Sequence, residues 1–102
     1  MNNSVLRVAL GQFFVQPESG TNLTIVSELI DRADQGGAGL LLLPEGIIAR
    51  KPGDNTWPVT HREPLDGPFL SGLLKASVGK TVTVVCTAQI ALPNEKRYAN
   101  DL

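Results

Sequence analysis

The sequence predicts an α/β unit with parallel strands, because three apolar segments alternate with two segments of helical periodicity. The apolar segments span residues 4–15, 40–44 and 80–92, and the helical segments span residues 21–35 and 68–78. The order strand, helix, strand, helix, strand requires crossover connections, which join parallel neighbours in one sheet. A chain of 102 residues is large enough for one small domain or for part of a larger one.

The segment "SVLRVALGQFFV" is rich in β-compatible side chains, and the turn-forming residues "QPESG" follow it. Thr21 or Asn22 is then placed to cap a helix by accepting a hydrogen bond from a free backbone amide. Helical spacing predicts an apolar stripe formed by Leu23, Val26, Leu29, Ile30 and Ala33. It leaves four charged residues facing solvent, which are Glu28, Asp31, Arg32 and Asp34. The helix ends at "GGAG", where Gly36 or Gly37 can adopt the left-handed conformation of a C-terminal cap.

Four consecutive leucines, Leu40–Leu43, predict a strand that is buried on both faces, and Pro44 ends it. Residues 45–68 then form a long connection rich in proline, glycine and charge, and a loop of this kind in a compact domain is usually functional. Pro68 suits the first turn of the second helix, and Asp66 lies just before it, against the positive end of the helix dipole. The predicted apolar stripe of this helix is Phe69, Leu70, Leu73, Leu74 and Val78.

The third predicted strand, "KTVTVVCTAQIAL", is followed by a turn at "PNEKR" and by "YANDL", where we expect another strand to begin. Crossovers are right-handed, so a sequential strand order places both helices on one face of the sheet and leaves the other face uncovered. The alternative is a middle-out order, which places the helices on opposite faces and closes a small sandwich. We favour the sequential order and predict the front part of a larger domain.

Composition excludes several classes of protein. The formal net charge is −1 and no basic patch is present, so we expect no nucleic acid or membrane partner. The longest apolar runs are far shorter than a bilayer span. The amino end has no basic segment, and Arg7 and Gln12 interrupt its apolar run, so we expect no signal peptide. Cys86 is the only cysteine, which rules out an internal disulfide and fits a reducing compartment. We therefore expect a cytoplasmic protein.

No cofactor or metal site is predicted. The stretch "SVGKT" lacks the glycine that a phosphate loop places five residues before Gly79, and it follows a helix where that loop follows a strand. The stretch "GGAG" lacks the spacing of a dinucleotide-binding turn. No group of His, Cys, Asp and Glu has the spacing of metal ligands.

Glu45 is the main candidate for chemistry, because α/β proteins place their working groups in the loops that follow parallel strands. A carboxylate held there over an apolar sheet is expected to be partly desolvated and so suited to proton transfer. The alternative is an ordinary loop acid exposed to water. Cys86 lies in a β-branched run and is interpreted as a core residue rather than a nucleophile. His61, in the long loop, is a minor candidate, and Lys75 and Lys80 are interpreted as solvated cations near a helix end.

Several pieces of the chain, taken in order, resemble the opening part of the carbon–nitrogen hydrolase (nitrilase) superfamily. They are Gly11-Gln12 after the first strand, Asn22 at the helix start, the Gly-Ala pair before the leucine strand, Pro44-Glu45, "LDGPFLSGLLKAS", "VTVVCTAQI" and "RYAN". The resemblance covers essentially the whole chain. It implies that residues 1–102 are the N-terminal portion of an α-β-β-α sandwich, with parallel strands and helices covering one face. Within the superfamily, "IIAR" followed by a polar loop is most similar to bacterial amidohydrolases that resemble deaminated glutathione amidase.

The resemblance also implies a chemistry. The family's triad is a glutamate, a lysine and a cysteine: the cysteine attacks an amide carbon and forms a thioester, the lysine stabilises the oxyanion, and the glutamate acts as general base. Glu45 matches the family's glutamate, the proton acceptor. The implied substrate is deaminated glutathione or another small ω-amide, with no cofactor, and the implied full-length parent is a homo-oligomer.

The sequence departs from the family pattern at the other two triad positions. The family's lysine follows its fourth strand and its cysteine comes later, so neither position falls within residues 1–102, and Lys80 and Cys86 lie on other elements. We therefore expect the parent protein to be an amidase and this chain alone to be inactive. The alternative is a small α/β binding or interaction module that reuses the fold without catalysis.

Overall fold

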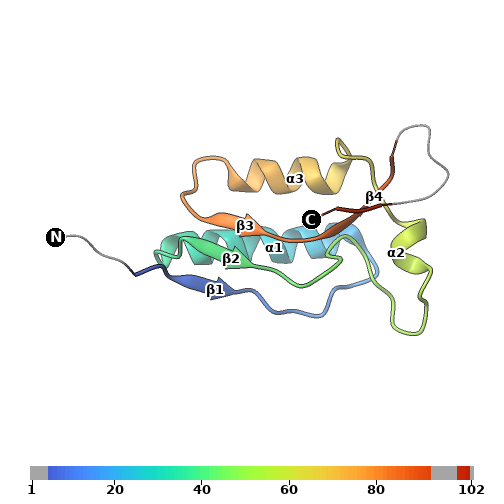
Figure 1. Cartoon of the computed structure of the whole chain (residues 1–102), viewed down its shortest axis with the longest axis horizontal. Coiled ribbons are helices and arrows are strands. Elements are labelled where there is room, and N and C mark those ends of the chain that lie inside the picture. The colour runs from blue at the N-terminus through green and yellow to red at the C-terminus, as the bar shows by residue number, and fades with distance from the viewer. Residues whose placement is uncertain (1–4, 93–98, 102) are drawn as a thin grey trace.

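The computed structural model describes residues 5–92 and 99–101 (Figure 1). Its elements, in chain order, are β1 (Val8–Leu10), α1 (Ser19–Gln35), β2 (Leu40–Leu42), α2 (Trp57–Thr60), α3 (Pro68–Ser77), β3 (Thr83–Val85), β4 (Ala88–Ile90) and β5 (Ala99–Asp101). The turn expected at "PNEKR" falls within residues 93–98, outside the described residues. The α/β class is confirmed, with α2 as a single helical turn inside the long connection.

The main sheet has the sequential strand order β1-β2-β3, and both pairs are parallel. The middle-out order is therefore wrong. Val8, Leu40 and Thr83 share one register row, and the next row pairs Ala9 with Leu41 and Val84. β1 is much shorter than the strand predicted over residues 4–15, because the chain leaves the sheet to reach α1 after Gly11, whose N–H donates to Leu42 O at 2.9 Å.

Helix α1 begins earlier than predicted. Its N-cap is Glu18, which makes no side-chain capping bond, so the expected cap at Thr21 or Asn22 is wrong. Asn22 is instead fully buried, one turn into the helix. The C-terminal end agrees with the prediction: Gly37 has φ +78, and Ala38 N–H donates to Ala33 O at 2.9 Å, as in a Schellman motif.

One face of the main sheet packs against both long helices. Leu41 is 1% exposed and belongs to a core cluster with Val26 and Ile30 of α1 and Leu73 of α3. Ala9 and Val84, from the same register row as Leu41, pack against this cluster. Because strand side chains alternate between faces, this row marks the helix-covered side of the sheet. Figure 1 shows the three strands side by side, with α1 behind them and α3 alongside α1.

The opposite face of the main sheet is open. Val8 is 46% exposed, Leu10 67% and Val85 47%, and all three lie in the register rows that flank the covered one. Leu40 and Leu42 on this face are half-buried. This open face is the one that the sequential strand order predicted, since both long helices cover the same side, as right-handed crossovers require. Among the described residues, the leucine strand is therefore buried on one face only.

Helix α3 begins at Pro68, as predicted, and its first turn has a side-chain hydrogen-bond partner in Glu63. The Glu63 carboxylate accepts the Phe69 N–H at 2.8 Å and so satisfies one free backbone amide of the first turn. Gly67 permits this approach, because a Cβ there would lie 2.7 Å from Glu63 Oε1. The predicted stripe of α3 is only partly correct: Phe69 and Leu73 are buried, while two of its members, Leu74 and Val78, are largely exposed.

The strand predicted over residues 80–92 is in fact two strands in two sheets. β3 completes the main sheet, and β4 pairs with β5 in an antiparallel pair. Cys86 and Thr87 separate β3 from β4. Beneath this break lies a second core cluster, formed by Ile47, Ile48, Ala49, Phe69, Ala88 and Ile90. The cluster holds the segment after β2 against β4 and the first turn of α3.

Asp34 is a further correction, since it does not simply face solvent. Its Oδ1 accepts hydrogen bonds from Thr81 N (2.8 Å), Thr81 Oγ1 (3.0 Å) and Val82 N (3.2 Å). These bonds, led by the one from Thr81 N–H, hold the pKa of Asp34 below its ordinary value of 3.8. Asp34 therefore ties the end of α1 to the segment that enters β3.

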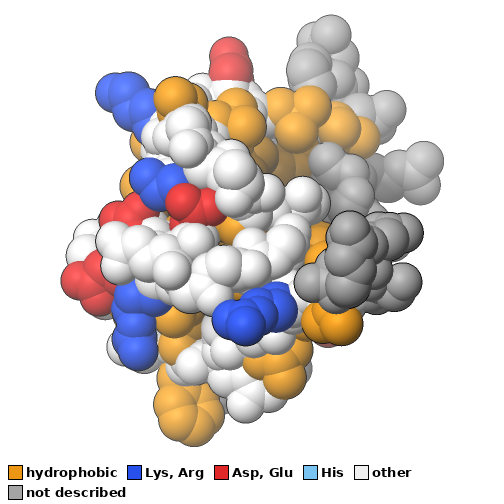
Figure 2. All heavy atoms as spheres, turned by 90° about the vertical axis from the view of Figure 1, so that its left-hand side faces the viewer, with side chains coloured by type: hydrophobic (Ala, Val, Ile, Leu, Met, Phe, Trp, Pro, Cys, Tyr) orange, Lys and Arg blue, Asp and Glu red, His pale blue; other side chains and the backbone are white. Residues whose placement is uncertain are grey.

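Figure 2 views the molecule from the edge where the strands of the main sheet begin. Lys and Arg side chains lie beside Asp and Glu side chains on this face, with exposed hydrophobic side chains between them. A face with intermixed charges presents no uniform field to a polyanion. No helix among the described residues is long and apolar enough to cross a membrane.

Candidate active site

Glu45 lies just beyond β2, at the carboxyl edge of the parallel sheet. Hydrogen bonds to the end of β3 and to the segment after it fix the backbone on both sides of Glu45: Leu43 N–H donates to Val85 O at 3.0 Å, and Ile47 N–H donates to Thr87 O at 3.2 Å. The predicted position of Glu45 is confirmed by this geometry, and so is the prediction that β1 and β2 are neighbours. The backbone that carries Glu45 is therefore held at a defined place on rigid elements.

The expected desolvation of Glu45 is not observed. The residue is exposed to solvent. The apolar strand beneath Glu45 fixes its position without removing it from water. A covering layer over this edge is what the expected partial desolvation requires.

Gly46 and Thr87 shape the turn that carries Glu45. Gly46 has φ +62, a left-handed conformation that is strained for any residue with a Cβ. Its N–H donates to Thr87 Oγ1 at 3.0 Å. Thr87 therefore holds this turn with both its side chain and its backbone carbonyl. The sequence carries no local signal for this contact, because the two residues lie far apart along the chain.

Asn22 joins the two loops at the same edge. Its Oδ1 accepts the Gln16 N–H at 2.7 Å, and its Nδ2 donates to Gln16 O at 2.8 Å and to Ile48 O at 2.9 Å. Gln16 follows β1 and Ile48 follows β2, so one buried side chain ties both loops to α1. Asn22 was predicted as a helix cap, and the structure shows that it braces the loops around Glu45.

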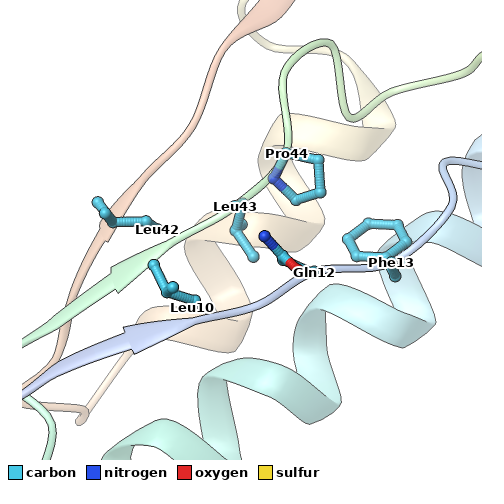
Figure 3. Close-up of a pocket in the computed structure, with 6 residues that line it drawn as sticks. All are labelled: Leu10, Gln12, Phe13, Leu42, Leu43 and Pro44. Carbon is cyan, nitrogen blue, oxygen red and sulfur yellow. The ribbon is translucent and has the colours of Figure 1, made fainter.

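A shallow pocket of about 330 Å³ opens at the ends of β1 and β2, and Pro44, the residue before Glu45, is part of its lining (Figure 3). Its lining is Leu10, Gln12, Phe13, Leu42, Leu43 and Pro44. Figure 3 shows the Gln12 side-chain amide directed into the space between the two strand ends. Gln12 can donate to a carbonyl oxygen and accept from an amide N–H, and Glu45, which follows Pro44, can accept a proton. An apolar hollow with a side-chain amide in its lining is suited to a small amide.

Cys86 differs from its prediction in two details. It lies just after β3 rather than within a strand, and it is partly rather than fully buried. It packs against both core clusters, and burial raises the pKa of its thiol. A raised pKa reduces the thiolate, which is the reactive form. These features favour the interpretation of Cys86 as a core residue.

His61 and Lys80, the minor candidates, contact neighbouring residues of the chain. The His61 ring stacks on Trp57 with 3.9 Å between ring centroids, and His61 Nδ1 lies 2.9 Å from Trp57 O. Lys80 Nζ lies 3.2 Å from Asp31 Oδ1. The stretch rejected as a phosphate loop forms the end of α3 and the turn after it. Among the described residues, no group of three or more His, Cys, Asp or Glu side chains could hold a metal ion.

Comparison with known proteins gives one informative match. The chain is 31% identical over 83 residues to the deaminated glutathione amidase of Escherichia coli O157:H7. The match covers 81% of this chain and 32% of that protein, so the chain spans about a third of the length of this curated relative. No family model matches the chain. The similarity suggests the nitrilase superfamily, and the parallel three-stranded sheet with helices is compatible with part of that fold.

Proposed function

We propose that residues 1–102 belong to a carbon–nitrogen hydrolase and supply its general base, Glu45. The observation that carries this proposal is the position of Glu45: its backbone is fixed by hydrogen bonds on both sides at the carboxyl edge of the sheet, and it directly follows Pro44, which lines an apolar pocket together with Gln12. The similarity to a protein named deaminated glutathione amidase supports the same reaction class.

In the proposed reaction Glu45 moves protons for a cysteine that comes from outside these residues. Glu45 accepts the thiol proton as sulfur bonds to the amide carbon, and a lysine, also from outside, stabilises the oxyanion of the tetrahedral intermediate. Glu45 then returns the proton to the departing nitrogen as the carbon–nitrogen bond breaks, which releases an amine (ammonia where the amide is primary) and leaves a thioester. Water, deprotonated by Glu45, attacks the thioester and releases the carboxylic acid and the thiol.

The proposed substrate is a small ω-amide such as deaminated glutathione, which is the compound in the relative's name. No cofactor takes part in the proposed reaction. We also propose that the whole protein is a homo-oligomer.

The test uses the product of the gene read to its stop codon, assayed for release of the free amine product, cysteinylglycine, from the N-substituted amide of deaminated glutathione. Glu45→Gln keeps the size of the side chain and removes the base, so we expect kcat to fall by about a hundredfold or more. Glu28→Gln is the matched control, because Glu28 is an exposed acid on α1. Full activity in Glu45→Gln would refute the proposal.

The purified 102-residue chain should hydrolyse no amide, since Cys86 is held in the core and has a raised thiol pKa. Amide turnover by this chain that disappears in Cys86→Ser would contradict the assigned roles. The alternative function, a binding module without catalysis, is favoured by the exposure of Glu45. It predicts that the complete gene product also lacks amidase activity while it still binds a small amide.

A further inference from the structure

The outer edge of β1 is a strand edge without a partner. β1 ends the strand order β1-β2-β3, and no other strand among the described residues pairs with it (Figure 1). Arg7 C=O accepts Gly39 N–H at 2.9 Å, and Gly11 N–H donates to Leu42 O at 2.9 Å, so both groups point toward β2. Backbone groups point to alternate sides along an extended strand. Three residues of this segment therefore direct their N–H and C=O groups outward, and they are Leu6, Val8 and Leu10.

This edge lacks the features that usually protect an edge strand. Natural proteins block such edges with charged residues, proline, bulges or a covering segment. Residues 5–14 contain one charged residue, Arg7, and no proline. Val5 is 76% exposed and Leu6 is 63% exposed, and Leu10 is exposed as well. The edge therefore presents free backbone groups and apolar side chains together.

Helix α1 leaves this edge open. A hollow of about 280 Å³ lies between β1 and α1, and its lining includes Ala9 of β1 and Leu29 and Ala33 of α1. The helix therefore does not close over the side of β1, and a further strand has room to lie beside it in the plane of the sheet. A strand that adds to a free edge in this way gains backbone hydrogen bonds and side-chain contacts together.

We propose that the partner of this edge is a second copy of the same chain, which pairs with β1 in the antiparallel direction around a twofold axis at Val8. In this register Val8 lies opposite Val8 of the second copy, and Leu6 of each copy lies opposite Leu10 of the other. These are the residues whose backbone groups point outward, so each opposite pair exchanges two N–H···O hydrogen bonds. A contact of this kind uses the same patch on both copies and closes as a dimer.

The residues around Val8 select both the partner and the register. With the axis at Val8, every opposed pair of outward residues is apolar. An axis one residue earlier places Arg7 directly opposite Arg7 of the second copy, and like charges in that position are destabilising. An axis one residue later places Leu6 opposite Gln12, beyond the point where the chain leaves the sheet after Gly11. The segment is therefore complementary to itself in one register.

The inference does not rest on the proposed reaction. Antiparallel pairing directs the carboxyl edges of the two sheets in opposite directions, so the two copies of Glu45 lie at opposite ends of the joined sheet. Failure of the dimer would therefore leave the proposed role of Glu45 untouched, and loss of that role would leave the dimer untouched.

The first test is sedimentation equilibrium of the 102-residue chain over a concentration series, combined with amide hydrogen exchange. We expect a reversible monomer–dimer equilibrium. The amides of Val8 and Leu10 should exchange slowly only at concentrations where the dimer forms, because their N–H groups have no partner strand in the monomer. The Ala9 amide faces β2 and should be protected at every concentration.

The second test places charges in the Leu6–Leu10 pairs. Leu6→Lys and Leu10→Glu each replace an exposed side chain, and each should weaken dimerisation by roughly fivefold or more. The double variant sets opposite charges against each other in both pairs and should restore much of the lost affinity. Leu74→Lys is the matched control, because Leu74 is a 69% exposed leucine on α3 and should leave dimerisation unchanged.

Three results would overturn the inference. A chain that stays monomeric across the concentration series has no self-complementary edge. A dimer in which the Val8 and Leu10 amides exchange as fast as in the monomer joins through another surface, such as the open sheet face. A double variant that dimerises no better than either single variant shows that Leu6 and Leu10 are not opposite each other.

Discussion

Replacing Asn22 with alanine should destabilise the fold and loosen both loops of the candidate site. The Asn22 side chain makes three hydrogen bonds, and Gln16 O keeps a second partner in Arg50 N–H. The variant therefore leaves two backbone groups without these partners, Gln16 N–H and Ile48 C=O. An unsatisfied group costs roughly 1–3 kcal/mol when buried, and since Gln16 is only partly buried we expect a loss of about 2–4 kcal/mol in the free energy of unfolding. That is a large share of the roughly 5–15 kcal/mol typical of a domain.

Urea denaturation followed by circular dichroism measures this loss, and amide hydrogen exchange at Gln16 reports whether its N–H has lost protection. Thr21→Ala is the matched control, because Thr21 is the exposed neighbour that could have been the helix cap. It should change the free energy of unfolding by no more than about 0.5 kcal/mol. Asn22→Asp keeps an acceptor for Gln16 N–H but places a second oxygen opposite two carbonyls, so it should also destabilise. Equal losses in Asn22→Ala and Thr21→Ala would refute the assigned bracing role.

Three further predictions concern other parts of the chain. The folded-state pKa of Asp34 is lowered from 3.8, so the contribution of Asp34 to stability is present above that pH and is lost as the pH falls through the lower folded value. The difference in unfolding free energy between the wild type and Asp34→Asn should therefore be large near neutral pH and smaller at about pH 3. A difference that does not change with pH would argue against this role of Asp34. Burial raises the pKa of the Cys86 thiol, so a disulfide reagent at neutral pH should modify the folded chain far more slowly than the chain in urea, and equal rates would revive a nucleophile role. The open sheet face should bind the hydrophobic dye ANS strongly. Leu10 is 67% exposed, so Leu10→Lys should reduce the ANS fluorescence with little change in stability. Unchanged fluorescence would mean that the dye binds elsewhere.

The sequence by itself determined the α/β class, the order of the main elements and the place of Glu45. These follow from local patterns, because helical periodicity, a run of leucines and a proline act on their immediate neighbours. The end of α1 at Gly37 and the start of α3 at Pro68 could also be predicted from local sequence, since each depends on the backbone preference of one residue. The resemblance to a family added a role for Glu45, and that role remains a proposal.

Only the tertiary structure decided how the segments after the strands are held. Asn22 has the side chain of a helix cap, yet it lies buried because Gln16 and Ile48 need its three bonds. The apolar run over residues 80–92 looks continuous, yet the strand is interrupted at Cys86 and Thr87. There the Thr87 side chain and backbone carbonyl accept hydrogen bonds from Gly46 N–H and Ile47 N–H. Such bonds join residues far apart in the sequence, and no local propensity encodes them.

The exposure of the site was likewise decided by packing. Four leucines are typical of a strand buried on both faces, and the sequential order predicted from the sequence placed α1 and α3 on the same side of the sheet. The open face leaves Leu10 exposed, and Glu45 at the sheet's edge is exposed too. Burial is a property of what lies opposite a residue, so the sequence could place Glu45 at the end of its strand but could not say whether anything covers it.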